Sequence, residues 1–249
     1  SISAALLWAL LCALPARAYI PSPERISAAA AEANRSAGRT RLLELKVALY
    51  LGDSEQAVAT GELLSDPGGL ARLEIRSPEG IVERHLLRAG ELLASRDAVR
   101  LDAPRPFLPP VFLLQAKTGG VLMTSLRALG VSAHEVALGY EGEHDCYVLG
   151  GRAPASALPP ASAASPASAL PSPRSSLWVD QESLEPVRFD RRDGVRFLLG
   201  SFVAFDSIRL PSWIEIGDSR GFRARLEILG AQPVSPAPGS FRREWLSAP

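Results

Sequence analysis

Alternating apolar and polar positions recur along most of this chain and predict a succession of short strands. From Leu43 to Leu51 every second residue is apolar, with Glu44 and Lys46 among the residues between them. Successive side chains of a strand point to opposite faces, so this segment is expected to bury one face only. Similar segments, bounded by glycine- and proline-containing turns, include residues 70–76, 176–180, 186–190, 195–206 and 222–229.

Two regions have helical rather than strand character. Ser22-Pro23-Glu24 supplies a capping hydroxyl, a first-turn proline and a first-turn acid, so we expect a helix from there to Ala37, ended by Gly38. Four prolines between residues 104 and 110 exclude a continuous strand. After them, residues 111–117 and 121–129 are predicted to form two short helices that share one apolar face.

Together these elements predict a mainly β or α+β fold with about eleven antiparallel strands and two helical patches. Long-range alternation of strands and helices is absent from the sequence, which argues against a Rossmann-type or barrel fold of parallel strands.

The first residues are typical of a secretory signal peptide. The apolar run at 4–14 is too short to span a bilayer, and Ala16-Arg17-Ala18 follows it as a cleavage site. The alternative is a buried N-terminal helix. Leu11 precedes Cys12, where a lipoprotein signal needs a small residue, so we expect cleavage near Ala18 and a soluble exported protein. Residues 1–18 are then the signal, and 19–249 form a single domain.

Composition narrows the function further. The chain has 27 Lys and Arg and 27 Asp and Glu among 249 residues, so its formal net charge is zero. A nucleic-acid-binding protein needs an excess of cations, so this class is not expected. Residues 153–173 contain only Ala, Pro, Ser and Leu, which predicts a mobile, uncharged insertion between two strands rather than a domain boundary.

Few residues are candidates for catalysis or for binding a metal or an anion. His144-Asp145-Cys146 is the one grouping that suggests a metal or a nucleophile, but we interpret Cys146 as a buried thiol near a histidine. The sequence has no Gly-x-Ser-x-Gly motif and no glycine-rich phosphate loop before a helix. We therefore expect no enzyme activity, metal or cofactor. Four arginines between 188 and 196 suggest either an anion site or, as we prefer, a solvated hairpin tip.

Residues 177–189 resemble the hairpin of the LolA/LolB-like periplasmic lipoprotein carriers, in which a strand with a terminal Asp is followed by a short turn, a proline and a second strand. Tyr147-Val148-Leu149-Gly150, Leu210-Pro211 before a strand, the last long strand at 222–229 and Phe241 are similar to further elements in the family's order. The resemblance spans about residues 23–243. It implies a strongly curved antiparallel half-barrel with helices covering its concave side and an apolar cavity between them.

The family resemblance also implies a function. The cavity would hold acyl chains of lipoproteins or another lipid, delivered and received by membrane-bound donor or acceptor proteins, and the carrier would be a monomer. The alternative is a LolA-like module that acts as a periplasmic sensor or an envelope-assembly interaction protein. Equally open is whether the candidate residues line a cavity or complete a core. They are Leu43, Leu45, Val47, Leu49, Phe112, Leu113, Val121, Leu122, Leu126 and Trp178.

Overall fold

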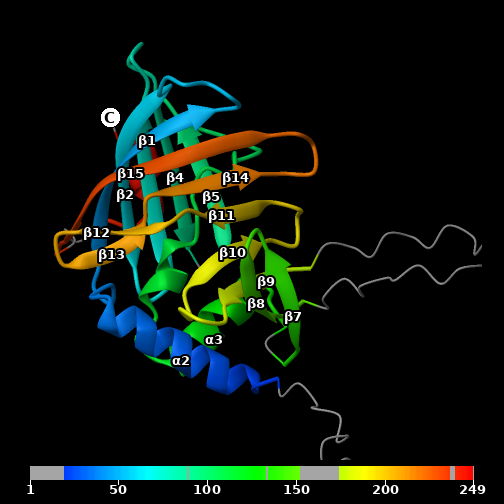
Figure 1. Cartoon of the computed structure of the whole chain (residues 1–249). Coiled ribbons are helices and arrows are strands. Elements are labelled where there is room, and N and C mark those ends of the chain that lie inside the picture. Colours follow the sequence, from blue (N-terminus) through cyan, green and yellow to red (C-terminus); the bar gives the residue numbers. More distant parts are fainter. Residues whose placement is uncertain (1–19, 89, 133, 152–173, 236–238, 249) are drawn as a thin grey trace, which may run out of the picture.

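One curved antiparallel sheet dominates the computed structural model, which describes residues 20–88, 90–132, 134–151, 174–235 and 239–248 (Figure 1). The predicted signal peptide and the insertion at 153–173 lie outside these residues. The sheet has 13 strands in the order β6-β5-β4-β3-β2-β1-β15-β14-β11-β10-β9-β8-β7. It is open rather than closed into a barrel, so the predicted half-barrel is confirmed.

The strands agree closely with the periodicity of the sequence. Their bounds are β1 Leu43–Leu51, β2 Ala59–Asp66, β3 Leu70–Arg76, β4 Val82–Arg88, β5 Glu91–Arg96, β6 Val99–Arg100, β7 Val136–Glu141, β8 His144–Leu149, β9 Ser176–Asp180, β10 Pro186–Asp190, β11 Arg196–Leu199, β14 Trp213–Gly217 and β15 Arg223–Pro233. In β1 the apolar alternation places Leu43, Leu45, Val47 and Leu49 on the inner face, where none is more than 2% exposed. The long strands β1 and β15 pair in the middle of the sheet and join its two halves.

Helices cover the inner face, as Figure 1 shows for α2 and α3 beneath the sheet. The bounds are α2 Pro23–Ser36, the 3-10 helix η1 Val111–Gln115 and α3 Gly119–Ala128. The Ser22 hydroxyl accepts a hydrogen bond from the Arg25 backbone at 3.3 Å and caps α2 as expected. Gly38 ends the helix with φ +71°, and a Cβ there would lie 2.7 Å from the Ser207 carbonyl oxygen. A glycine is therefore required at this close approach.

The single strand expected over residues 195–206 is wrong. The segment forms β11 and then β12 (Phe202–Phe205), which leaves the main sheet and pairs only with β13 (Ile208–Pro211). The break falls at Gly200, where a Cβ would lie 2.3 Å from the indole of Trp213. The backbone thus packs directly against this ring, and the described residues contain 15 strands rather than about eleven.

A buried arginine fastens η1 to its surroundings. Arg39 is fully buried, and its guanidinium donates to the Leu114 carbonyl at 3.2 Å, the Arg209 carbonyl at 2.9 Å and the Glu185 carboxylate at 2.9 Å. Burial lowers the pKa of Arg39 from its usual value, although the carboxylate opposes this shift. Gln115 adds a second attachment through Ser65 Oγ at 2.5 Å. The C-terminal end of η1 is thereby tied to α2, to the β12–β13 hairpin and to β2.

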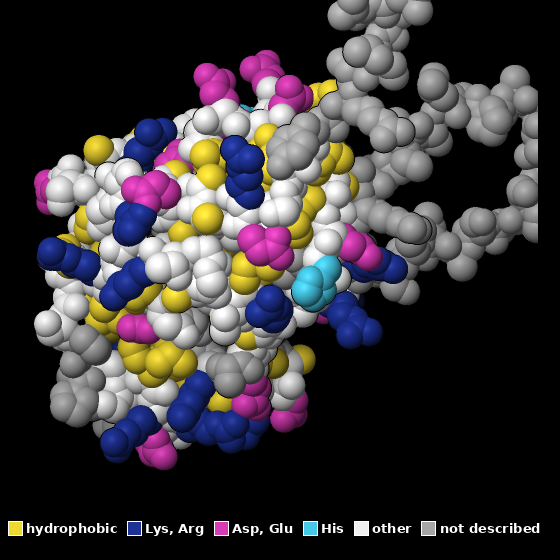
Figure 2. All heavy atoms as spheres, turned by 90° about the horizontal axis from the view of Figure 1, so that it is seen from below, with side chains coloured by type: hydrophobic (Ala, Val, Ile, Leu, Met, Phe, Trp, Pro, Cys, Tyr) yellow, Lys and Arg dark blue, Asp and Glu magenta, His cyan; other side chains and the backbone are white. Residues whose placement is uncertain are grey.

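One edge of the outer face is covered. There the C-terminal segment with η2 (Arg243–Ser247) packs Leu246 and Trp245 against Leu86 of β4 and Leu93 of β5. Figure 2 shows the side below α2, where apolar side chains lie in separate patches between charged groups of both signs. Among the described residues, no helix has the length and apolar character that crossing a membrane requires.

Candidate functional site

A small apolar cavity lies between η1 and the strands of the second half of the sheet. Its volume is about 20 Å³, and its walls expose no polar surface. Space of this size holds about one water molecule, and an apolar lining keeps such a space dry. The lining residues are Pro109, Pro110, Val111, Leu113, Leu114, Leu177, Pro186, Phe189, Phe197, Leu199 and Ile214.

Of the ten candidate residues, only Leu113 lines this cavity. Seven others are buried in the same apolar core without lining it: Leu43, Leu45, Val47, Leu49, Phe112, Leu122 and Leu126. Val121 lies near the start of α3 and is 36% exposed, so its side chain does not face the core. The structure therefore brings most candidates together as core rather than as cavity wall.

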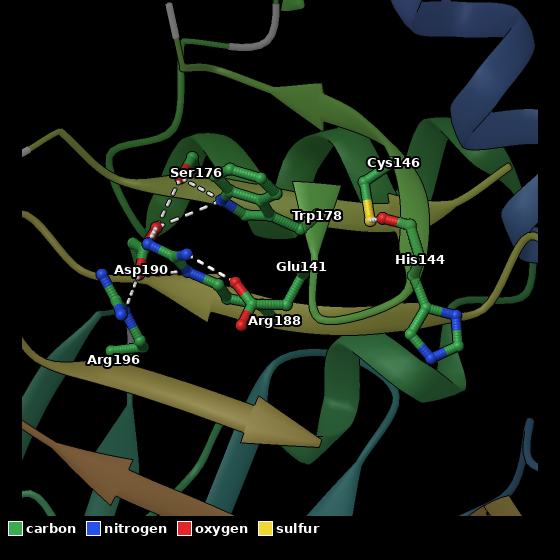
Figure 3. A network of polar contacts seen from close by, with 8 residues as sticks. All are labelled: Glu141, His144, Cys146, Ser176, Trp178, Arg188, Asp190 and Arg196. Carbon is green, nitrogen blue, oxygen red and sulfur yellow. Dashed lines mark hydrogen bonds and ion pairs between the residues drawn. The ribbon is translucent and has the colours of Figure 1, made fainter. Parts of the chain in front are cut away.

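Trp178 lies on the outer face of the sheet, which corrects its expected position on the concave wall. It packs with Cys146 and Val148, separately from the main core, and its indole N–H donates to Ser176 Oγ and Asp190 Oδ2, each at 3.1 Å. The Arg188 guanidinium lies over the indole ring at 4.4 Å (Figure 3). The neighbouring Leu177 points inward instead, because adjacent strand residues face opposite sides.

The His144–Cys146 pair does not form a reactive site. Figure 3 shows the imidazole directed away from the Cys146 sulfur. His144 Nδ1 lies 2.8 Å from Asp180 Oδ2, and Cys146 is fully buried, which confirms the interpretation of a buried thiol. Burial, followed by the nearby Asp180 charge, raises the pKa of Cys146 to about 11. Among the described residues, no three His, Cys, Asp or Glu side chains gather as metal ligands would.

The arginine cluster divides between the two sides of the β10–β11 hairpin. Arg188 pairs with Glu141 at 2.6 Å and with Asp190 at 2.8 Å, and Arg196 pairs with Asp190 at 3.2 Å. These two cations are therefore neutralised on the outer face (Figure 3). Arg191 and Arg192 lie in the turn and line a second, larger pocket beside the apolar cavity.

A polar pair on β4, in the first half of the sheet, interrupts the apolar inner face. Glu83 and His85 of β4 are 3% and 0% exposed, and His85 Nε2 lies 2.9 Å from Glu83 Oε1. Arg105 binds the same carboxylate, and its guanidinium lies over the Phe107 ring. Burial alone would raise the pKa of Glu83, but the hydrogen bonds from His85 and Arg105 outweigh it and lower the pKa.

The lowered pKa of Glu83 makes part of the stability dependent on pH. A lowered native pKa stabilises the fold above the unfolded value, about 4.3 for glutamate, and this contribution disappears as the pH falls through the native pKa. We expect the Glu83→Gln variant to be less stable than wild type by about 1–3 kcal/mol at pH 7, because Arg105 loses its partner. The difference should shrink as the pH falls below 4. Urea unfolding of both proteins at several pH values measures it, and a difference that grows at low pH would contradict this role.

Ten of the eleven lining residues were not among the candidates: four lie in or just before η1 (Pro109, Pro110, Val111 and Leu114), and six come from β9, β10, β11 and β14. Leu177, Phe189, Phe197, Leu199 and Ile214 occupy alternating apolar positions in their strands. Alternation separates these residues from their neighbours on the opposite face of each strand. It does not show which of the two faces points inward, so the candidates include Trp178 and not the neighbouring Leu177.

Comparison with known proteins identifies the fold. The sequence matches no family model and no curated protein. Among solved structures, a LolA superfamily protein from Nitrosomonas europaea matches with a TM-score of 0.51 at 12% identity, covering 91% of this chain and 100% of that chain. A DUF1329 family protein from Desulfovibrio piger matches with a TM-score of 0.50 at 10% identity and the same coverage. The half-barrel with its helical cover is thus a LolA-like fold, in agreement with the resemblance found in the sequence.

Proposed function

We propose that this protein binds an acyl chain of a lipoprotein or another lipid between η1 and strands β9, β10, β11 and β14, and carries it in the periplasm. The observation that supports this is the small cavity between these elements, whose lining exposes no polar surface. Membrane-bound donor or acceptor proteins would load and unload it. Carriage of this kind requires no catalytic residue.

The cavity must enlarge to hold a chain, because about 20 Å³ is far less than an acyl chain fills. Each methylene transferred from water contributes about 0.8 kcal/mol, so six buried methylenes offset about 5 kcal/mol of rearrangement. The polar attachments of η1 make its C-terminal end costly to move. Side chains of β10 and β11 are the more adaptable walls.

The first test compares two adjacent leucines of β11. Leu199 lines the cavity, whereas Leu198 points to the other face, and both are half-buried. Native mass spectrometry of residues 19–249 with a diacylated lipopeptide is expected to show a one-to-one complex. Leu199→Gln should weaken it by about 5- to 150-fold, because an amide without a partner costs about 1–3 kcal/mol in an apolar site. Leu198→Gln should bind like wild type.

Equal weakening by both substitutions would place the chain elsewhere. Absence of any lipid complex with the wild-type protein, despite native circular dichroism, would contradict carriage itself.

A second candidate function is a LolA-like module that docks a protein in envelope sensing or assembly. One observation favours it: an open groove of about 400 Å³ on the outer face, between the β12–β13 hairpin and strands β1 and β15. Leu229, which is 57% exposed, and Phe205 lie in it beside Lys46 and Asp206. Stoichiometric co-purification of a protein without lipid, lost on Leu229→Glu, would favour this function over carriage.

A further inference from the structure

A pocket of about 200 Å³ lies directly beside the small apolar cavity and shares two lining residues with it. The β4–β5 turn, the end of α3 and the β10–β11 turn surround it. Gly90 packs closely against the end of α3, because a Cβ at this position would lie 2.8 Å from the Ala128 carbonyl oxygen. The apolar lining consists of Leu87, Gly90, Leu92, Leu108, Pro110, Ala128, Leu129 and Phe189.

The polar lining of this pocket is cationic. It comprises Arg191, Arg192 and Asp193, all from the β10–β11 turn. Asp193 pairs with Arg191 at 2.7 Å, and within the described part of the chain no carboxylate pairs with Arg192. Arg188 and Arg196, the other two arginines of the hairpin, pair with Glu141 and Asp190 on the outer face (Figure 3). The positive charge that these carboxylates do not neutralise therefore lies at the pocket.

The two spaces are neighbours with shared walls. Pro110 and Phe189 line both the small apolar cavity and the larger pocket. Phe189 also stacks on Phe197, another residue of the cavity wall, with ring centroids 6.2 Å apart. Phe189 is therefore shared by a wholly apolar space and by a pocket that Arg191 and Arg192 line.

We infer that the pocket binds the anionic headgroup of an amphiphile whose acyl chain enters the small apolar cavity past Phe189. Guanidinium groups bind phosphate and carboxylate oxygens through paired hydrogen bonds, and the apolar floor suits the first methylenes of the chain. The inference rests on the proposed function and specifies its ligand: a lipid with a phosphate or carboxylate headgroup rather than a neutral or cationic one.

The experiment measures binding of three amphiphiles with the same dodecyl chain, below the concentrations at which they form micelles. Dodecyl phosphate, dodecyl maltoside and dodecyltrimethylammonium differ only in headgroup. The tested variant is Arg191→Gln with Arg192→Gln. The matched control is Arg41→Gln with Arg100→Gln, which removes the same charge from exposed sites that line neither pocket. Inorganic phosphate alone is a fourth probe, since a free anion shares the headgroup's chemistry.

Wild type should bind dodecyl phosphate about tenfold more tightly than the turn variant does, with no change in the control and little change for the maltoside. Asp193→Asn should strengthen binding of the phosphate several-fold, because it releases Arg191. High salt should weaken the same interaction.

Equal affinity for all three headgroups would overturn the inference and leave acyl binding intact. Binding of inorganic phosphate as tight as that of dodecyl phosphate would also overturn it, since the ligand would then be a free anion. If no dodecyl compound bound at all, the proposed carrier function would be contradicted together with it.

Discussion

Replacing Arg39 with alanine is expected to lower the free energy of unfolding by about 3–5 kcal/mol, the usual effect of removing one partner of a buried ion pair. Arg39 is fully buried, and its loss leaves the Glu185 carboxylate with a weaker, 3.4 Å contact to Arg209. The Leu114 carbonyl loses its donor as well. Because these groups belong to η1, the β9–β10 turn and the β12–β13 hairpin, the cover of the cavity should loosen as a unit.

Urea unfolding at pH 7 measures this effect. Arg41→Ala is the control, since Arg41 is exposed two residues away and should change stability by less than about 0.5 kcal/mol. Adding Glu185→Gln to Arg39→Ala should restore part of the loss, because it removes the unpaired charge. A loss below 1 kcal/mol for Arg39→Ala would show that this network is not what holds η1.

Phe189→Ala should have an effect of similar size, about 3–5 kcal/mol, because it deletes a buried aromatic ring. Phe189 is 2% exposed and lines both the small apolar cavity and the larger pocket beside it. The substitution should therefore destabilise the free protein and at the same time create one continuous space. A ligand that fills this space should restore more stability to the variant than to wild type.

Thermal unfolding with and without dodecyl phosphate tests both parts. Phe205→Ala on the β12–β13 hairpin is the matched control, since Phe205 is half-buried and lies away from both inner spaces. It should cost less than half as much and leave the ligand-induced shift unchanged. A smaller shift for Phe189→Ala than for wild type would mean that the ring binds the chain rather than blocks it.

Much of the fold could be predicted from the sequence, because strand periodicity and helix capping are local. The segments 70–76, 176–180 and 186–190 are strands with the expected bounds. The break at Gly200 was missed, since its cause is the contact with Trp213, and that residue is distant in sequence. The strand β13 was missed for a related reason: Ile208 and Leu210 are buried only because the hairpin folds back onto the core.

The site was harder to predict than the fold. Alternation divides residues between two faces, but which face is inner depends on where the helices pack. Trp178 and Leu177 illustrate this, because the larger residue lies outside against Arg188 and the smaller one lines the cavity. Glu83 and His85 are the opposite case, since polar residues are buried on the inner face once Arg105 compensates the charge.

The burial of Cys146 affects how readily its thiol can react. With a pKa of about 11, only about one thiol in ten thousand is ionised at pH 7, and disulfide exchange requires the thiolate. Cys146 is also 0% exposed and packs against Val148 and Trp178, which limits the access of oxidants and other proteins to the sulfur. In the folded protein we therefore expect this thiol to react slowly with oxidants and to stay unpaired.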